Sequence, residues 1–364
     1  MSPSAPAYLS RIPPKCAELQ ETWPYLRDGL ERIMTHMPGD EMSFTAYTNL
    51  YTTIYNFFKS ASISSTFELY NNIGTLFAKH LEQIGQHSES LHGVDLLRYY
   101  SEQWERYTNN ATYANRLFII MNRSWIKQVG DFEKMRDAEK RDAEKKTIYP
   151  IYTLALMQWK QCIFIPVQQN LINALLGLIM QDRDGAPIDQ ALIKTVVDSL
   201  VSLGVDDNNL YKKCLEVYVD FKAPFMIETE RYYKKESETI LAKNSISEYL
   251  RKAEDRLREE EDRVGRYLHP STRPGLIVLC ERVLIKEHAQ VIRDSFQSLL
   301  DGDKYEDLGR MHALLSRVPG ELEPLRNRFE AHVKQVAPFS ASLDEAYQEL
   351  ANRRVATDVS TGSS

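Results

Sequence analysis

The sequence predicts an all-α protein, and three observations support this prediction. Apolar residues recur at helical spacings of three and four from about residue 17 onward, without a convincing alternating strand pattern. Glycine and proline are sparse, 15 of each in 364 residues, and many stand where a helix should begin or end. The segments between them are about 15 to 28 residues long, a length that suits packed helices.

Two segments show the helical pattern most clearly. The first, Ser43–Lys59, has a broad apolar stripe made of Phe44, Tyr47, Leu50, Tyr51, Ile54, Tyr55 and Phe58. The second, Ser247–Leu268, is highly charged, with a narrower seam made of Tyr249, Leu250, Ala253, Leu257, Val264 and Leu268. Its other side is expected to be a solvated face with ion pairs one turn apart, formed by Lys252, Glu254, Arg256, Glu259 and Arg263.

Composition bounds the class of protein. Hydrophobic residues make up 43% and charged residues 26%, which is typical of globular proteins. The length fits two or three packed units rather than one core. Because 45 basic residues face 51 acidic ones, the net charge of −6 lacks the basic signature of a nucleic-acid-binding protein.

The sequence also bears on location. No stretch approaches 18 consecutive apolar residues, so no membrane span is expected, and the first residues lack the apolar core of a signal peptide. The four cysteines are far apart, without a CxxC motif. We therefore expect free thiols in a reducing intracellular compartment, the cytoplasm and nucleus.

Motifs that carry chemistry are missing from the sequence. There is no phosphate-binding glycine loop, no HExxH and no GxSxG, and the eight histidines show no ligand spacing. Asp301-Gly302-Asp303 lacks the pattern of a calcium loop and is expected to be a helix-capping turn. We therefore expect no catalytic residue, no metal and no cofactor; an enzyme would need a cofactor that copurifies.

The most unusual segment is a charged run at residues 133–146. It holds the repeat RDAEK twice, at Arg136–Lys140 and Arg141–Lys145. We expect a solvated helical extension or a flexible loop, and a docking tail is the alternative. Residues 1–16 and 358–364 are expected to be disordered.

Several segments, in order along about residues 17–333, resemble the cullin family. Each motif alone is weak, but together they are specific. They are Leu50–Asn56 (LYTTIYN), Gln103–Glu105 (QWE), Met121–Trp125 (MNRSW), Ile151–Leu156 (IYTLAL), Thr229–Tyr233 (TERYY), Glu248–Glu254 (EYLRKAE), Tyr267–Thr272 (YLHPST) and Asp307–Met311 (DLGRM). The tyrosine-rich early helix is most similar to the cullin scaffold of SCF ubiquitin ligases.

The resemblance implies a fold of tandem cullin repeats, stacked five-helix bundles that form an elongated curved stalk. Repeat 1 is expected at 17–165, repeat 2 at 166–270 and a shortened repeat 3 at 271–357. The family's C-terminal half, which binds the RING subunit, is not found in this sequence. The resemblance then implies a non-catalytic scaffold unable to recruit the RING subunit, which could act as a competitor.

The resemblance also implies partners and a site. Repeat 1 of an SCF cullin binds a Skp-family adaptor that carries an F-box protein, and a cullin-exchange factor could also touch the stalk. The expected adaptor-binding residues are Tyr47, Leu50, Tyr51, Ile54, Asn115, Phe118 and Asn122. Tyrosine is a preferred interface anchor because it combines a large ring with a polar tip.

The main alternative for the early helix is that its stripe belongs to the core. Stripes at helical spacing are usually buried, and Trp104, Trp125 and Trp159 are assigned to the core. If Tyr47 and Tyr51 were buried, the chain would instead be a helical-rod tethering protein that uses cullin repeats without adaptor binding.

Overall fold

The computed structural model describes residues 13, 18–35, 42–126, 148–206 and 209–336. The charged run at 133–146, residues 1–12 and the tail at 358–364 lie outside these described residues. The chain divides into two compact units, Met1–Phe221 and Lys222–Ser364. The repeat boundaries expected near residues 165 and 270 stay predictions.

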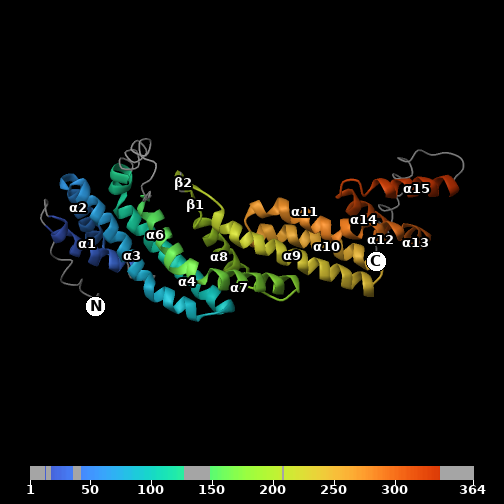
Figure 1. Ribbon diagram of the computed structural model, residues 1–364, viewed down its shortest axis with the longest axis horizontal. Helices are drawn as coiled ribbons and strands as arrows, with labels where there is room; N and C mark the ends of the chain where they lie inside the picture. Colours follow the sequence, from blue (N-terminus) through green and yellow to red (C-terminus); the bar gives the residue numbers. More distant parts are fainter. Residues whose placement is uncertain (1–12, 14–17, 36–41, 127–147, 207–208, 337–364) are drawn as a thin grey trace, which may run out of the picture. The chain divides into compact units, whose positions relative to one another are not determined.

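The described part of the first unit is a bundle of helices (Figure 1). Side chains of Ser43, Ser62 and Asp189 accept hydrogen bonds from backbone N–H groups at the starts of three helices, which explains where those helices begin. The helices are α1 (Leu19–Met34), α2 (Phe44–Ser60), α3 (Ile63–Ser90), α4 (Gly93–Leu117), α6 (Ile151–Trp159), α7 (Ile165–Arg183) and α8 (Gln190–Ser202), with π-helical turns η2 (Met121–Trp125) and η3 (Lys160–Phe164).

An aromatic cluster forms the centre of this unit. Trp159 packs edge-on against Tyr100 and Trp104 and lies 5.2 Å from Tyr107, measured between ring centroids. Its indole Nε1 donates to the Tyr100 hydroxyl at 3.1 Å, and the Tyr107 hydroxyl donates to the carbonyl of Ala155 at 2.9 Å. The predicted core positions of Trp104, Trp125 and Trp159 are confirmed.

Residues Ile151–Arg183 form one continuous helical segment that is long and apolar enough to cross a membrane by length and composition, and it contains an 18-residue stretch with a mean hydropathy of 1.6. The sequence criterion missed it because polar residues interrupt every apolar run. In the bundle, α6 packs against α3 and α4, and α7 packs against α4. A central helix needs apolar residues on more than one side, so packing accounts for its composition.

The all-α fold also contains one short antiparallel hairpin, which the sequence analysis did not predict. Strand β1 (Val205–Asp206) pairs with β2 (Asn209–Lys213), so that Val205 faces Lys213 and Asp206 faces Asn209. Strands this short carry too few residues to show an alternating pattern, which is why the sequence did not predict them.

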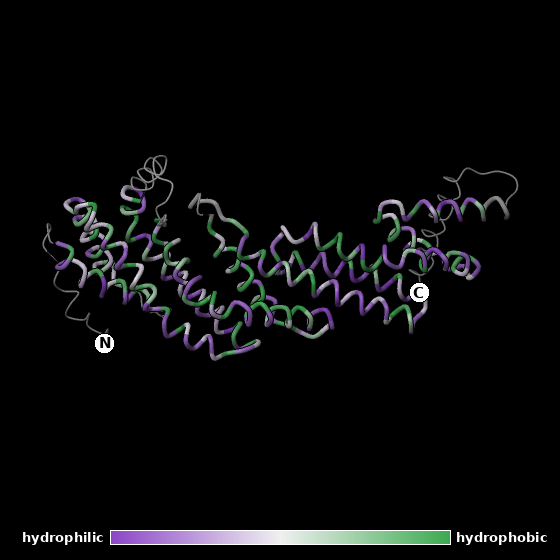
Figure 2. Tube along the Cα trace, in the orientation of Figure 1, coloured by the Kyte–Doolittle hydropathy of each residue, from purple (hydrophilic) through white to green (hydrophobic). Residues whose placement is uncertain are grey.

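The second unit continues with helices and short 3₁₀ turns. Helix α9 (Glu216–Lys243) contains the boundary between the two units. The remaining elements are α10 (Ile246–Tyr267), η4 (Pro270–Thr272), α11 (Arg273–Leu284), η5 (Lys286–His288), α12 (Ala289–Asp294), α13 (Phe296–Asp301), α14 (Tyr305–Ser316) and α15 (Glu323–Val336). Hydrophilic and hydrophobic residues alternate along these helices, as expected for amphipathic packing (Figure 2).

Helix α10 corrects one expectation about charge. Its apolar seam is buried as predicted, but Arg256 and Arg263, expected on a solvated face, are buried too. The Arg256 guanidinium pairs with Glu236 of α9 at 2.5 Å, and Arg263 pairs with the buried Glu260. The Tyr233 hydroxyl donates to the same Glu260 carboxylate at 2.5 Å. The carboxylates and the phenol that make burial of these arginines possible lie partly on α9, which the α10 sequence cannot reveal.

The turn at Asp301-Gly302-Asp303 is a helix-capping turn, which confirms the prediction. The Gly302 N–H donates to the carbonyl of Ser298, and the Lys304 N–H donates to that of Leu299. Asp303 has a φ of 55°, in the left-handed region common at helix C-termini. Its carboxylate accepts a hydrogen bond from the Tyr305 hydroxyl at 2.7 Å.

Candidate interaction site

Helix α2 carries the first half of the expected site, and its residues divide between core and surface. Leu50 and Ile54 are each 1% exposed and belong to the core. Tyr51 is 36% exposed and Tyr47 is half-buried. Leu50 and Ile54 therefore offer no surface to a partner in this structure, and they serve α2 as core anchors.

The position of α2 depends on a close approach to α1. A Cβ atom added to Gly29 would lie 2.5 Å from Cδ2 of Leu50, closer than real carbon atoms approach. With glycine at this position the Leu50 side chain packs directly on the backbone of α1, and a larger residue would force that side chain to shift. The contact holds α2 close to α1, with Tyr47 and Tyr51 on its accessible side.

An exposed aromatic patch joins α2 to α4. We define the aromatic patch as Phe44, Tyr47, Tyr51 and Tyr113. The rings of Tyr47 and Tyr113 meet edge to face, with centroids 5.8 Å apart and planes at 84°. Phe44 is 84% exposed and Tyr113 is 45% exposed. Exposed aromatic side chains grouped in this way are typical of protein-binding surfaces.

One positive charge, that of Arg116, acts on the aromatic patch. Partial burial is the main cause that raises the pKa of the Tyr47 phenol, and the neighbouring phenols of Tyr113 and Tyr51 act in the same direction. The guanidinium of Arg116 opposes them and lowers that pKa, because a positive charge stabilises a phenolate. Arg116 therefore acts on the patch electrostatically.

Asn115, Phe118 and Asn122, predicted as the second half of the site, are engaged inside the chain. Phe118 is fully buried. The Asn122 Oδ1 atom accepts from the Ile151 N–H at 3.0 Å, and the Asn115 Oδ1 atom accepts from the Tyr152 N–H at 3.2 Å. These two amides therefore cap the beginning of α6. Their contact with a partner stays a prediction, whereas the structure assigns them a clear internal role.

Sequence reasoning left Phe44 and Tyr113 out of the site. Phe44 was assigned only to an apolar stripe, although it is the first residue of α2 and lies beyond the part that packs. Tyr113 comes two residues before Asn115. It was left out because the sequence analysis identified no apolar stripe in this segment. The spacing of Tyr113 and Arg116, three residues apart on one face, was an available signal.

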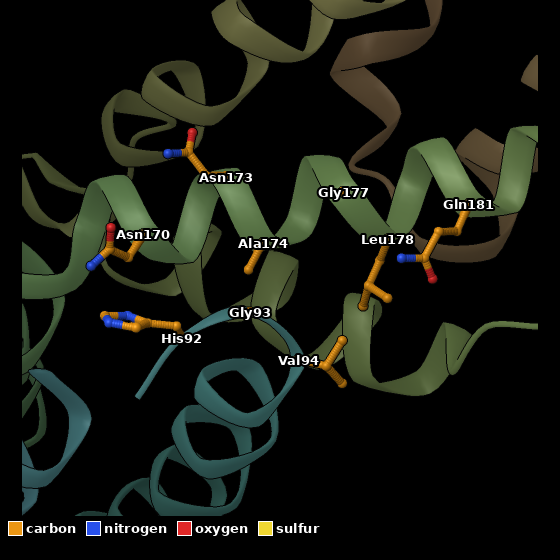
Figure 3. Close-up of a pocket in the computed structure, with 9 residues that line it drawn as sticks. All are labelled: His92, Gly93, Val94, Asn170, Asn173, Ala174, Gly177, Leu178 and Gln181. Atoms are coloured by element: carbon orange, nitrogen blue, oxygen red, sulfur yellow. The ribbon is translucent and has the colours of Figure 1, made fainter. Parts of the chain in front are cut away.

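Apart from the aromatic patch, the first unit has a depression between the start of α4 and helix α7, with a volume of about 380 Å³ (Figure 3). His92 and Val94 face the α7 residues Asn170 and Leu178. The lining holds no carboxylate and no thiol or hydroxyl, so it provides no nucleophile or acid–base pair beyond one exposed imidazole. In the part of the chain that the structure describes, no three metal-ligating residues cluster.

Comparison with known proteins gives a family. Residues 23–357 match the cullin alpha solenoid domain. The chain is 36% identical over 340 residues to Cullin-1 of Dictyostelium discoideum and 34% identical over 337 residues to Cullin-1 of Schizosaccharomyces pombe, covering 88% of the chain in both cases. It is 28% identical over 349 residues to cell division control protein 53 of Saccharomyces cerevisiae, covering 90% of the chain.

The matched regions are 43%, 42% and 42% of the lengths of these three relatives, so the chain spans less than half of each. The helical architecture agrees with the matched domain, because nearly all described residues outside the β1–β2 hairpin and the connecting turns are helical. The domain match covers most of the sequence and includes both compact units. The chain therefore belongs to the cullin family.

Proposed function

We propose that this chain is a scaffold segment of an SCF-type ubiquitin ligase and that its first unit binds a Skp-family adaptor carrying an F-box protein. The observation that carries the proposal is the aromatic patch. It is exposed on α2 and α4, the two segments where the cullin resemblance places adaptor binding. The similarity to two proteins named Cullin-1 supports the choice of an SCF-type cullin.

In this proposal the chain supplies position rather than chemistry. Tyr47, Tyr51 and Tyr113 bury their rings against the adaptor, and their hydroxyls bond to polar groups at its edge. Burying a large side chain contributes roughly 1.5–3 kcal/mol of transfer free energy. A cluster of such anchors is sufficient for specific binding when the surface is already ordered.

The surface is ordered before a partner arrives. The Gly29–Leu50 contact fixes α2, and the Asn115 and Asn122 caps tie the end of α4 and η2 to α6. These contacts hold the two halves of the patch on separate, internally braced helices. Binding of a partner then loses little conformational entropy from ordering these helices, which favours affinity.

The experiment is calorimetric titration of the chain with a purified Skp-family adaptor–F-box complex. The Tyr47→Ala/Tyr51→Ala double variant is expected to weaken binding at least about tenfold, since truncating a central anchor costs about 2 kcal/mol. The control is Tyr305→Ala in the second unit, because Tyr305 is also 36% exposed but lies outside the patch. Circular dichroism checks that helicity is unchanged.

The alternative outcome has a clear meaning. If the folded chain does not bind the complex, the adaptor-binding proposal is wrong. The helical-rod tether then becomes the better hypothesis, in which cullin repeats serve spacing alone. Equal weakening by Tyr305→Ala would also contradict the proposal, because the loss would not depend on the patch.

A further inference from the structure

The segments that build the patch contain no carboxylates, although the whole chain has a net charge of −6. Residues 42–67, which include α2, hold Lys59 but no Asp or Glu. Residues 106–126, which include the end of α4 and η2, hold Arg106, Arg116 and Arg123 but no Asp or Glu. The nearest carboxylates in sequence are outside the ends of these two segments. These two segments are therefore basic in an acidic chain.

Two of these arginines are exposed, and neither forms an ion pair among the described residues. Arg116 follows Tyr113 by three residues on α4, so helical spacing places these two near one face, and Arg123 lies on the π-helical turn η2 that follows α4. Several arginines of the second unit differ, because they form ion pairs within the chain. Arg310 pairs with Glu254, and Arg317 pairs with Glu281. The cations beside the patch are thus available to charges from outside the chain.

We infer that the surface formed by the aromatic patch, Arg116 and Arg123 binds an acidic protein surface, in which carboxylates face the two guanidinium groups and apolar side chains face the rings. The inference rests on the proposed function and names the chemistry of the partner's surface. Charge complementarity selects this class of partner, because a basic or neutral surface would leave both guanidinium groups without counter-charges.

The two parts of the surface contribute differently to binding. Exposed ion pairs contribute little to affinity, about 0–1 kcal/mol each, because water and salt screen them. Their main effect is to steer the partner during approach, which raises the association rate. The buried rings then slow dissociation. The acidic partner should therefore associate quickly at low salt and more slowly as salt increases.

The test measures association and dissociation rates of the chain with the purified Skp-family adaptor–F-box complex by surface plasmon resonance. The association rate is expected to fall about tenfold between about 50 mM and about 500 mM sodium chloride. Arg116→Glu should lower the rate about threefold at low salt, and Arg116→Glu/Arg123→Glu about tenfold, with dissociation changed less than about twofold.

The matched control is Arg98→Glu. Arg98 is also exposed, lies on α4 and makes no ion pair among the described residues, but it precedes Arg116 by about five helical turns, or roughly 27 Å. The Arg98→Glu variant changes the net charge by the same amount as Arg116→Glu, but at a site away from the patch. The association rate of the Arg98→Glu variant should stay close to that of the unmodified chain. A milder variant, Arg116→Gln/Arg123→Gln, tests the same charges if the glutamate variants fold poorly.

Three outcomes separate the inference from the proposed function. Tight binding that depends on Tyr47 and Tyr51 but not on salt or on Arg116 and Arg123 overturns the inference and leaves the proposed function. Equal slowing by Arg98→Glu and Arg116→Glu also overturns the inference, because net charge would then explain the effect. No binding by a folded chain overturns both.

Discussion

At Gly85 the backbone of α3 lies against that of η3. A Cβ atom at this position would be 2.9 Å from the carbonyl oxygen of Cys162. The obstacle is backbone rather than a flexible side chain, so it cannot turn away. Glycine is therefore required here by the neighbouring helix and not by the conformation of α3 itself.

We predict that Gly85→Ala destabilises the first unit by about 1–3 kcal/mol, because the two helices must move apart. The matched control is Gly177→Ala on α7, where a Cβ atom meets nothing within 4 Å. That change should be neutral or stabilising by up to about 1 kcal/mol, since alanine favours helices. Urea unfolding of both variants measures the difference. Equal changes in the free energy of unfolding of both variants would show that helix propensity, and not the contact with Cys162, determines the effect.

At the scale of elements, the beginning of α6 is held by side chains from elsewhere in the unit. Pro150 precedes the helix and provides no side-chain cap. The Ile151 and Tyr152 N–H groups bond instead to Asn122 and Asn115, and the Tyr149 N–H bonds to the hydroxyl of Tyr70 on α3. Helix α6 thus starts where three other segments supply acceptors.

We predict that Asn122→Ala removes this cap and destabilises the first unit by about 1 kcal/mol or more, because the Ile151 N–H loses its acceptor. Hydrogen exchange of the Ile151 and Tyr152 amides should become faster, while exchange in the middle of α3 changes little. Asn173→Ala on α7 is the control, since Asn173 is exposed and its side chain accepts a hydrogen bond from the Gln169 side chain on the same helix. Unchanged exchange at α6 would contradict the capping role.

Helix α2 shows how one element serves two purposes. Its inner side fixes the helix through Leu50 and Ile54, and its outer side presents Tyr47 and Tyr51. Substitution of an inner residue would therefore disturb the site through folding, whereas substitution of an outer residue would act on binding directly. Mutational tests of the proposed adaptor contact need this distinction, because under that proposal both kinds of substitution would reduce binding.

At the scale of the whole molecule, partly buried histidines link stability to pH. Burial is the main cause that lowers the pKa of His80 in the first unit and of His288 and His312 in the second. Positive charges of Arg106 and Arg326 lower the pKa of His80 and His312 further. In each case the folded chain favours the neutral imidazole, so the unfolded chain takes up protons at a higher pH.

We predict that the melting temperature falls as the pH is lowered from about 7.5 through the ordinary histidine pKa of about 6.5 toward 5.5. The sign follows because the unfolded state binds more protons in this window, so lowering the pH favours unfolding. The variant His80→Gln/His288→Gln/His312→Gln should show a shallower decline. Calorimetry at several pH values measures it, and an identical decline in the variant would contradict the histidine origin.

Much of the fold follows from the sequence. The 3/4 spacing in Ser43–Lys59 and Ser247–Leu268 predicted α2 and α10 to within a residue or two, because amphipathic periodicity is a local property. The positions of Trp104, Trp125 and Trp159 in the core were also predicted correctly. The hairpin at Val205–Lys213 was missed, since it is too short to produce a pattern.

The candidate site was predicted less completely. The cullin motifs indicated two segments, both of which carry part of the aromatic patch, but the motifs could not tell which side chains face outward. Asn115 and Asn122 cap α6, Phe118 is buried, and Phe44 and Tyr113 are exposed instead. Which residues are accessible depends on where α1 and α6 pack, and those contacts join residues far apart in the sequence.

The sequence by itself determined the all-α class, the main helices, the family and the acidic balance of the chain, because periodicity, motifs and composition are properties of the chain read in order. Only the tertiary structure decided which side of α2 is accessible, that Arg256 and Arg263 are buried beside carboxylates, and that Tyr113 completes the aromatic patch. The physical reason is that burial and charge pairing depend on the neighbours that packing brings together, and those neighbours lie on other helices.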